Sequence, residues 1–123
     1  MNQFSNNKTD YNLEERTAVF AERTIDLVKT IKETAVNRNI ISQLIAVAGS
    51  IGANYCEATE AESKKDFIHK IGVSKKEIKK TRYWLRLLAR AHPEHKEVIR
   101  KFWAESHELL LIFSKINRTS KNN

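Results

Sequence analysis

The sequence predicts an all-α protein, an antiparallel up-down-up-down four-helix bundle. Apolar residues recur at spacings of three and four through four long segments, as in helices that bury one side. The chain has only three glycines and one proline, and short polar connections separate the segments, so consecutive helices should lie antiparallel. A chain of 123 residues is long enough to bury one core. We expect a single domain over residues 1–123, with flexible tails at 1–11 and 119–123.

The first helix is expected from Leu13 to about Val36. Asn12 can cap it, with Glu15 three residues later in a capping-box arrangement. Its other side is mostly acidic and could complement a basic helix of the same or a neighbouring subunit. The predicted buried stripe is Leu13, Thr17, Phe20, Thr24, Leu27, Ile31 and Ala35.

The second helix is expected from Ile40 to about Ala61, after a polar connection at residues 37–39. No charged residue occurs from Asn39 to Cys56, a length close to that of a minimal membrane-spanning helix. The polar residues and two glycines within that stretch favour a helix buried in a bundle instead, so we expect a cytoplasmic, soluble protein with no membrane partner. Both sides of this helix are uncharged, which indicates a second neighbour, another subunit. The lone Cys56 is interpreted as a small buried hydrophobe in a reducing compartment.

The third helix, expected from a Ser63 cap to Ala91, carries the net positive charge of the chain. It contains ten of the 22 basic residues and two of the 15 acidic ones, a net charge of +8, so the rest of the chain has a net charge of −1. The basic residues form a stripe beside the apolar one. The predicted buried stripe is Phe67, Ile71, Ser74, Ile78, Thr81, Leu85 and Leu88.

The basic stripe has two interpretations. It could be an ordinary solvated surface, or it could face an anion, because like charges four residues apart repel unless something neutralises them. A concentrated basic helix is typical of surfaces that bind RNA or DNA phosphates. Tyr83 could stack on a base there or lie at a helix or subunit boundary; Trp84 and Trp103 are expected as core or interface anchors. The candidate nucleic-acid-binding residues are Lys64, Lys75, Lys76, Lys79, Lys80, Arg82, Arg86 and Arg90.

The fourth helix is expected from Pro93, a residue suited to a first helical turn, to about Ile116. His92 and His95 near its start have no further ligand set at matching spacing, so we expect no metal site. The sequence contains no glycine-rich phosphate loop after a strand, and no nucleophile beside a base. We therefore expect no catalytic residues, no cofactor and no enzymatic activity.

Several short motifs occur in order along the chain. They are Arg16-Thr17-x-x-Phe20-Ala21, Gln43-Leu44, Ser50-Ile51-Gly52-Ala53-Asn54-Tyr55, Glu57-Ala58, Ser63-x-x-Asp66-Phe67, Lys76-Glu77, Thr81 and Tyr83-Trp84-Leu85-x-Leu87-Leu88. In these motifs the chain resembles the four-helix-bundle family of 23S rRNA intervening-sequence proteins over roughly residues 16–88. Two positions depart from the family pattern: Ala46 replaces a frequent arginine, and the connection at residues 37–39 lacks a frequent proline.

The resemblance implies a homopentameric ring or barrel. It also implies a relationship to the accessory protein of diversity-generating retroelements, which is thought to bind nucleic acid and a reverse transcriptase through a basic surface. We expect a non-enzymatic homo-oligomer that binds nucleic acid, RNA in particular, through the third helix. The alternative is a protein-interaction scaffold whose basic stripe contacts acidic residues of a partner or of the first helix in the next subunit, at Glu22, Asp26 and Glu33.

Overall fold

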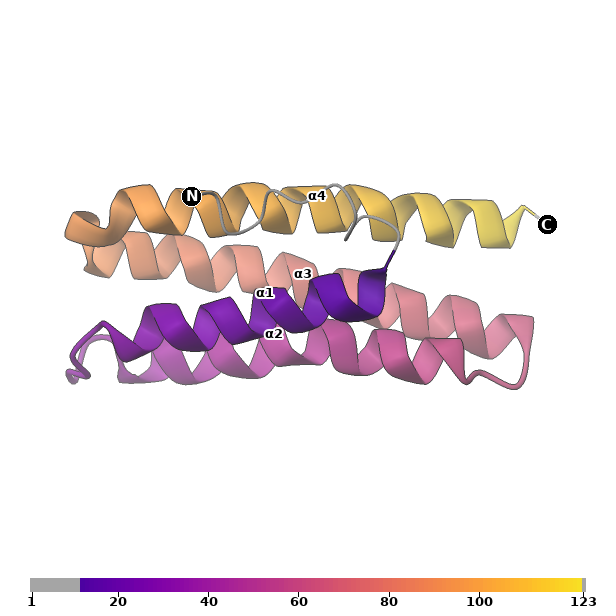
Figure 1. Cartoon of the computed structure of the whole chain (residues 1–123), viewed down its shortest axis with the longest axis horizontal. Coiled ribbons are helices and arrows are strands. Elements are labelled where there is room, and N and C mark those ends of the chain that lie inside the picture. The colour runs from indigo at the N-terminus through magenta and orange to yellow at the C-terminus, as the bar shows by residue number, and fades with distance from the viewer. Residues whose placement is uncertain (1–11, 123) are drawn as a thin grey trace.

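The computed structural model describes residues 12–122 of the chain. Consecutive α-helices run in opposite directions along the bundle (Figure 1), and each packs against the next one in the chain. This confirms the predicted all-α fold and its up-down order. The predicted tail at residues 1–11 lies outside the described residues. The elements are α1 Leu13–Lys29, α2 Arg38–Thr59, α3 Lys64–Ala91, the 3-10 turn η2 Pro93–His95 and α4 Lys96–Lys121.

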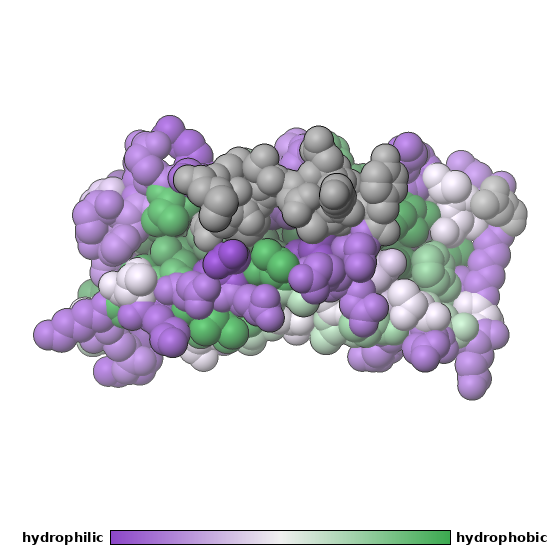
Figure 2. Space-filling model, in the orientation of Figure 1, coloured by the Kyte–Doolittle hydropathy of each residue, from purple (hydrophilic) through white to green (hydrophobic). Residues whose placement is uncertain are grey.

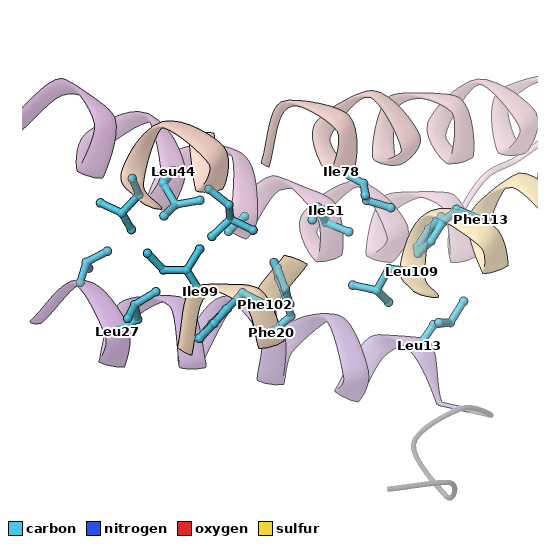
Figure 3. Close-up of a cluster of buried hydrophobic side chains, with 14 of the residues drawn as sticks. Leu13, Phe20, Leu27, Leu44, Ile51, Ile78, Ile99, Phe102, Leu109 and Phe113 are labelled. Carbon is cyan, nitrogen blue, oxygen red and sulfur yellow. The ribbon is translucent and has the colours of Figure 1, made fainter. Parts of the chain in front are cut away.

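All four α-helices contribute to one hydrophobic core (Figure 3). The aromatic rings of Phe20 in α1 and Phe102 in α4 meet edge to face with centroids 5.9 Å apart, a favourable aromatic geometry. The predicted stripe of α3 is confirmed: all its members are buried except Phe67, which is half-buried. Hydrophilic side chains cover the two ends of the bundle in Figure 2, with apolar patches along its middle.

Two of the predicted helix caps are present. Asn12 Oδ1 accepts a hydrogen bond from the backbone N–H of Glu15, and Ser63 Oγ accepts one from the backbone N–H of Asp66, both at 3.0 Å. Each satisfies an N–H that the first helical turn leaves without a partner. The local sequence signals therefore identified both helix starts.

The end of α1 differs from the prediction: the helix stops at Lys29 and not at Val36. Thr30 Oγ1 donates a hydrogen bond to the carbonyl of Leu27 at 2.7 Å, and the Thr30 N–H bonds the same carbonyl at 3.0 Å. These tighter bonds close the last turn. The predicted inner residue Ala35 is exposed, whereas Ile31 is buried just beyond the helix.

Asn37 explains why the chain leaves the helical path. Its side chain is fully buried; Nδ2 donates to the carbonyl of Lys32 at 2.8 Å and lies 2.9 Å from His92 Nε2. Its Oδ1 accepts from the Thr34 N–H at 2.8 Å. The predicted polar connection is thus a folded loop fastened to the turn between α3 and α4, and α2 begins at Arg38 rather than Ile40.

The last helix is also longer than predicted. It starts with the 3-10 turn at Pro93 and continues to Lys121, beyond the expected end at Ile116, so residues 119–121 of the predicted tail are helical. Asn117 is buried, and its Nδ2 donates to the carbonyl of Ile68 in α3 at 3.2 Å. This contact holds the extra turns against α3.

The two mid-helix glycines of α2 have different surroundings. A Cβ at Gly52 would lie 2.7 Å from Thr17 Oγ1, so α1 and α2 approach closely here. A Cβ at Gly49 would have nothing within 4 Å. Cys56, expected to be buried, is exposed, with Sγ 3.8 Å from Glu14 Oε1. Within residues 12–122, no helix has the length and apolarity needed to cross a membrane.

Candidate functional site

The basic stripe of α3 follows the outer side of the α3–α4 pair. Lys75, Lys79, Arg82 and Arg86 recur at spacings of four, three and four, which places them in one row along the helix. Lys79 and Arg86 are exposed, and Lys75 and Arg82 are half-buried. Two open grooves lie along this row. Lys75 and Lys79 line the first groove, Arg86 lines the second, and Arg82 lies between them.

The first groove, named here the lysine groove, has a volume of about 370 Å³ and is formed by α3 and α4 alone. Three of the predicted binding lysines line it from α3, and Lys121 joins them from the end of α4. No carboxylate is among the lining residues. The lining residues are Ile68, His69, Gly72, Val73, Lys75, Lys76, Lys79, Asn117 and Lys121.

The four lysines of this groove form no ion pair with a carboxylate in the part of the chain that the structure describes. Four ammonium groups gathered at one groove repel each other, and each like-charged helical neighbour costs a few tenths of a kcal/mol. A bound polyanion would remove this repulsion. The groove therefore gathers positive charge that no lining carboxylate compensates.

Lys121 was not among the predicted binding residues, because the chain after Ile116 was expected to fray. Once α4 continues to Lys121, its side chain lies beside the lysines of α3. A sequence signal was available: Lys121 follows Asn117 at helical spacing.

Arg82 has a structural environment that its neighbours in the stripe lack. Its guanidinium lies 3.9 Å from the centroid of the Trp103 ring, and Nη1 donates to the Trp103 carbonyl and to Ser106 Oγ, both at 2.8 Å. Burial lowers the pKa of Arg82 below its ordinary value. No carboxylate among the described residues pairs with it, so α3 and α4 are joined here by a cation whose charge is not neutralised.

The second groove, named here the tryptophan groove, also has a volume of about 370 Å³ and lies further along the same helix pair. Its lining combines four apolar side chains with three cationic ones, of which Arg100 also pairs with Glu97 at 3.4 Å. Trp103, expected as a core or interface anchor, is 38% exposed in this chain. The lining residues are Leu85, Arg86, Ala89, Lys96, Ile99, Arg100 and Trp103.

The remaining predicted binding residues lie away from both grooves. Lys64 and Arg90, near the two ends of α3, are exposed and line neither groove. Lys80 is also exposed, and its Nζ pairs with Glu77 Oε1 at 3.1 Å. Tyr83 is 55% exposed, and its ring meets the Trp84 ring edge to face, with centroids 5.2 Å apart. The structure thus concentrates the predicted site at the lysine groove and at Arg86.

The acidic side of α1 is partly neutralised within the chain. Asp26 lies 3.7 Å from Arg23, and Glu33, in the loop after α1, lies 3.1 Å from Arg38. Both pairs are exposed and therefore weak. They nevertheless reduce the charge that α1 can offer to the basic stripe of another subunit.

One buried ion pair was absent from the sequence-based prediction. Arg16 in α1 and Glu105 in α4 form two parallel hydrogen bonds of 2.8 and 2.9 Å, with 8% and 6% exposure. Glu105 lies three residues after Phe102 and four before Leu109, so its position on the buried stripe was a detectable signal. Its partner, 89 positions earlier, was not.

Comparison with known proteins identifies the family. Residues 9–115 match the model of the 23S rRNA-intervening sequence proteins. The chain belongs to this family. A crystal structure from Bacteroides thetaiotaomicron, of a protein with unknown function from the S23 ribosomal protein family, is 31% identical. It superposes with a TM-score of 0.74 over 85% of this chain and 96% of the other.

The family match and the four-helix order together confirm the resemblance inferred from the motifs. A search among curated proteins found no match. Membership in the 23S rRNA-intervening sequence protein family accounts for the fold and the ancestry of the chain.

Proposed function

We propose that this member of the family is a non-enzymatic homo-oligomer that binds nucleic acid, RNA in particular, through the phosphates that contact the basic face of α3. The observation that carries the proposal is the lysine groove, where Lys75, Lys76, Lys79 and Lys121 gather without a lining carboxylate. Contacts between ammonium groups and phosphates supply affinity without reading sequence. The expected partner is therefore a nucleic acid recognised by its backbone.

The homo-oligomer in this proposal is the pentameric ring that the family resemblance implies. The side of α2 that faces away from the core supports a contact between copies. Ile45 is 38% exposed there, an apolar side chain that a neighbouring copy could cover. In a ring, several lysine grooves would be presented together, so one strand could contact several subunits and bind with increased avidity.

The test is binding of labelled RNA and DNA over a salt series, with the molecular mass measured on the same samples. If about four phosphates are neutralised for each engaged subunit, log K should fall against log salt with a slope of about −3 to −4. A slope near zero would show that phosphates do not carry the binding.

Lys75→Glu/Lys79→Glu is the informative variant, because both side chains line the groove and Arg82, which joins α3 to α4, is left intact. Its matched control is Lys101→Glu/Lys115→Glu, which makes the same change in net charge at two exposed positions of α4 outside the groove. We expect the first variant to lose about a hundredfold or more in affinity and the control to lose far less, with unchanged mass in both.

Equal losses in the two variants would point to net charge rather than to the groove. An intact oligomer that ignores RNA and DNA at low salt would contradict the proposal and favour the protein-interaction scaffold. In that case Lys79→Glu should lower the mass of the oligomer, because the stripe would then contact acidic residues of the next subunit.

A further inference from the structure

The tryptophan groove has a chemistry that phosphate binding alone does not use. Its lining combines the apolar side chains of Leu85, Ala89 and Ile99 with the indole of Trp103. The cationic groups of Arg86, Lys96 and Arg100 complete the lining. A ligand that fits has a flat or apolar part to enter the groove and negative charge beside it.

The indole of Trp103 is held in place from α3. Arg82 stacks 3.9 Å from the ring centroid and donates to the Trp103 carbonyl, which restricts the motion of the side chain. Arg82 does not line the groove, whereas Trp103 does, so the part of the indole that faces the groove is not covered by the guanidinium. A preorganised, partly exposed aromatic ring loses little entropy when a second flat group stacks on it.

The two grooves lie along the same row of basic residues. Lys79 lines the lysine groove, Arg86 lines the tryptophan groove, and Arg82 lies between them. The seven steps from Lys79 to Arg86 span roughly 11 Å at 1.5 Å per residue. A strand whose phosphates contact the lysine groove therefore needs only a few nucleotides to reach Trp103.

We propose that the tryptophan groove holds an unpaired base of a single-stranded nucleic acid whose phosphates contact the lysine groove. This inference rests on the proposed function and specifies its partner as single-stranded. In a duplex the bases are paired and stacked, so its outer surface offers phosphates but no base face to an indole. A single strand offers both, and cationic grooves with aromatic platforms are the usual means of binding it.

The experiment compares a short labelled RNA of mixed, unstructured sequence with the same RNA annealed to its complement, at one salt concentration. Trp103→Ala should weaken single-strand binding about tenfold, the loss of one base–aromatic stack, and leave duplex binding within about twofold. Trp103→Phe should restore most of the single-strand affinity. Leu111→Ala is the control, because Leu111 is 53% exposed on the same helix and lines neither groove.

A second variant retains the indole and its contact with Arg82. Ala89→Gln places a longer neutral side chain in the groove and should lower single-strand binding without changing duplex binding. In a Trp84→Phe background, the fluorescence of Trp103 should be quenched by the single strand and not by the duplex. Circular dichroism of each variant checks that the helices are intact.

The outcomes separate this inference from the proposed function. If Trp103→Ala and Ala89→Gln leave single-strand binding unchanged while Lys75→Glu/Lys79→Glu abolishes it, the base site is wrong and phosphate binding stands. If the wild type binds neither RNA, both are wrong. If Trp103→Ala lowers the oligomer mass, the groove is a contact between copies and the base site is overturned.

Discussion

At two of the contacts between helices, here called seams, an arginine packs against α4, but only one of these two arginines is paired with a carboxylate. In the α1–α4 seam, Arg16 is buried and forms two hydrogen bonds with the carboxylate of Glu105. In the α3–α4 seam, Arg82 contacts the Trp103 ring, a carbonyl and the Ser106 hydroxyl, all of them neutral groups. The first charge is cancelled inside the protein, and the second remains as positive potential on the surface.

The difference shows that one helix bundle can neutralise a charge at one contact between helices and leave a charge without a carboxylate at another. The contact between α1 and α4 is the sparsest of the seams between α-helices that touch, so a directional bidentate pair can define how α1 lies on α4. In the α3–α4 seam, apolar packing and Asn117 already hold the two helices together. The two helices therefore pack without a carboxylate partner for the cations, and these cations stay available to an external anion.

Removing the carboxylate of the α1–α4 seam should have the largest effect on stability. Glu105→Ala leaves the buried guanidinium of Arg16 without its ion-pair partner, and breaking a buried pair in this way costs about 3–5 kcal/mol. Unfolding in urea, followed by circular dichroism, measures the loss. The double variant Arg16→Met/Glu105→Leu should recover most of it, because no charge is then left buried. A double variant as unstable as Glu105→Ala would contradict this explanation.

The α1–α2 seam provides a comparison without a buried ion pair. Gly52→Ala would place a Cβ 2.7 Å from Thr17 Oγ1, and Thr17 is buried and bonded to the Leu13 carbonyl. We expect a loss of about 1–3 kcal/mol from this overpacking. Gly49→Ala, three residues earlier on the same helix and with nothing within 4 Å of the new Cβ, should instead stabilise the protein by about 0.5–1 kcal/mol. Destabilisation by both, or a lower oligomer mass for Gly49→Ala, would show that another copy covers Gly49.

Among the substitutions expected to destabilise the protein, the smallest loss is expected in the α3–α4 seam. Arg82→Met keeps a flexible chain beside Trp103 and removes hydrogen bonds to groups near the surface, so the loss should be about 1–2 kcal/mol. The same variant should reduce the slope of log K against log salt by at most about one unit. A loss as large as that of Glu105→Ala would mean that Arg82 is needed to hold the fold together, unlike the lysines of the lysine groove.

Regular features of the fold were predictable because they depend on neighbours in the sequence. The spacing of apolar residues identified the buried side of α3 from Ile71 to Leu88, and Asn12 and Ser63 marked two helix starts through contacts only three residues away. The concentration of lysines in α3 likewise identified residues that line the lysine groove. Cys56 shows the limit of this reasoning, since an uncharged helix suggested burial and the thiol is exposed.

The sequence by itself determined the helical class, the order of the four helices and the helix that carries the positive charge, because periodicity, caps and composition act over a few residues. Only the tertiary structure decided where α1 and α4 end, through Asn37 at His92 and Asn117 at Ile68. It also decided that Lys121 joins the lysines of α3 and that Arg82 fastens Trp103. These outcomes depend on partners 21 to 55 positions away, which helix packing alone brings together.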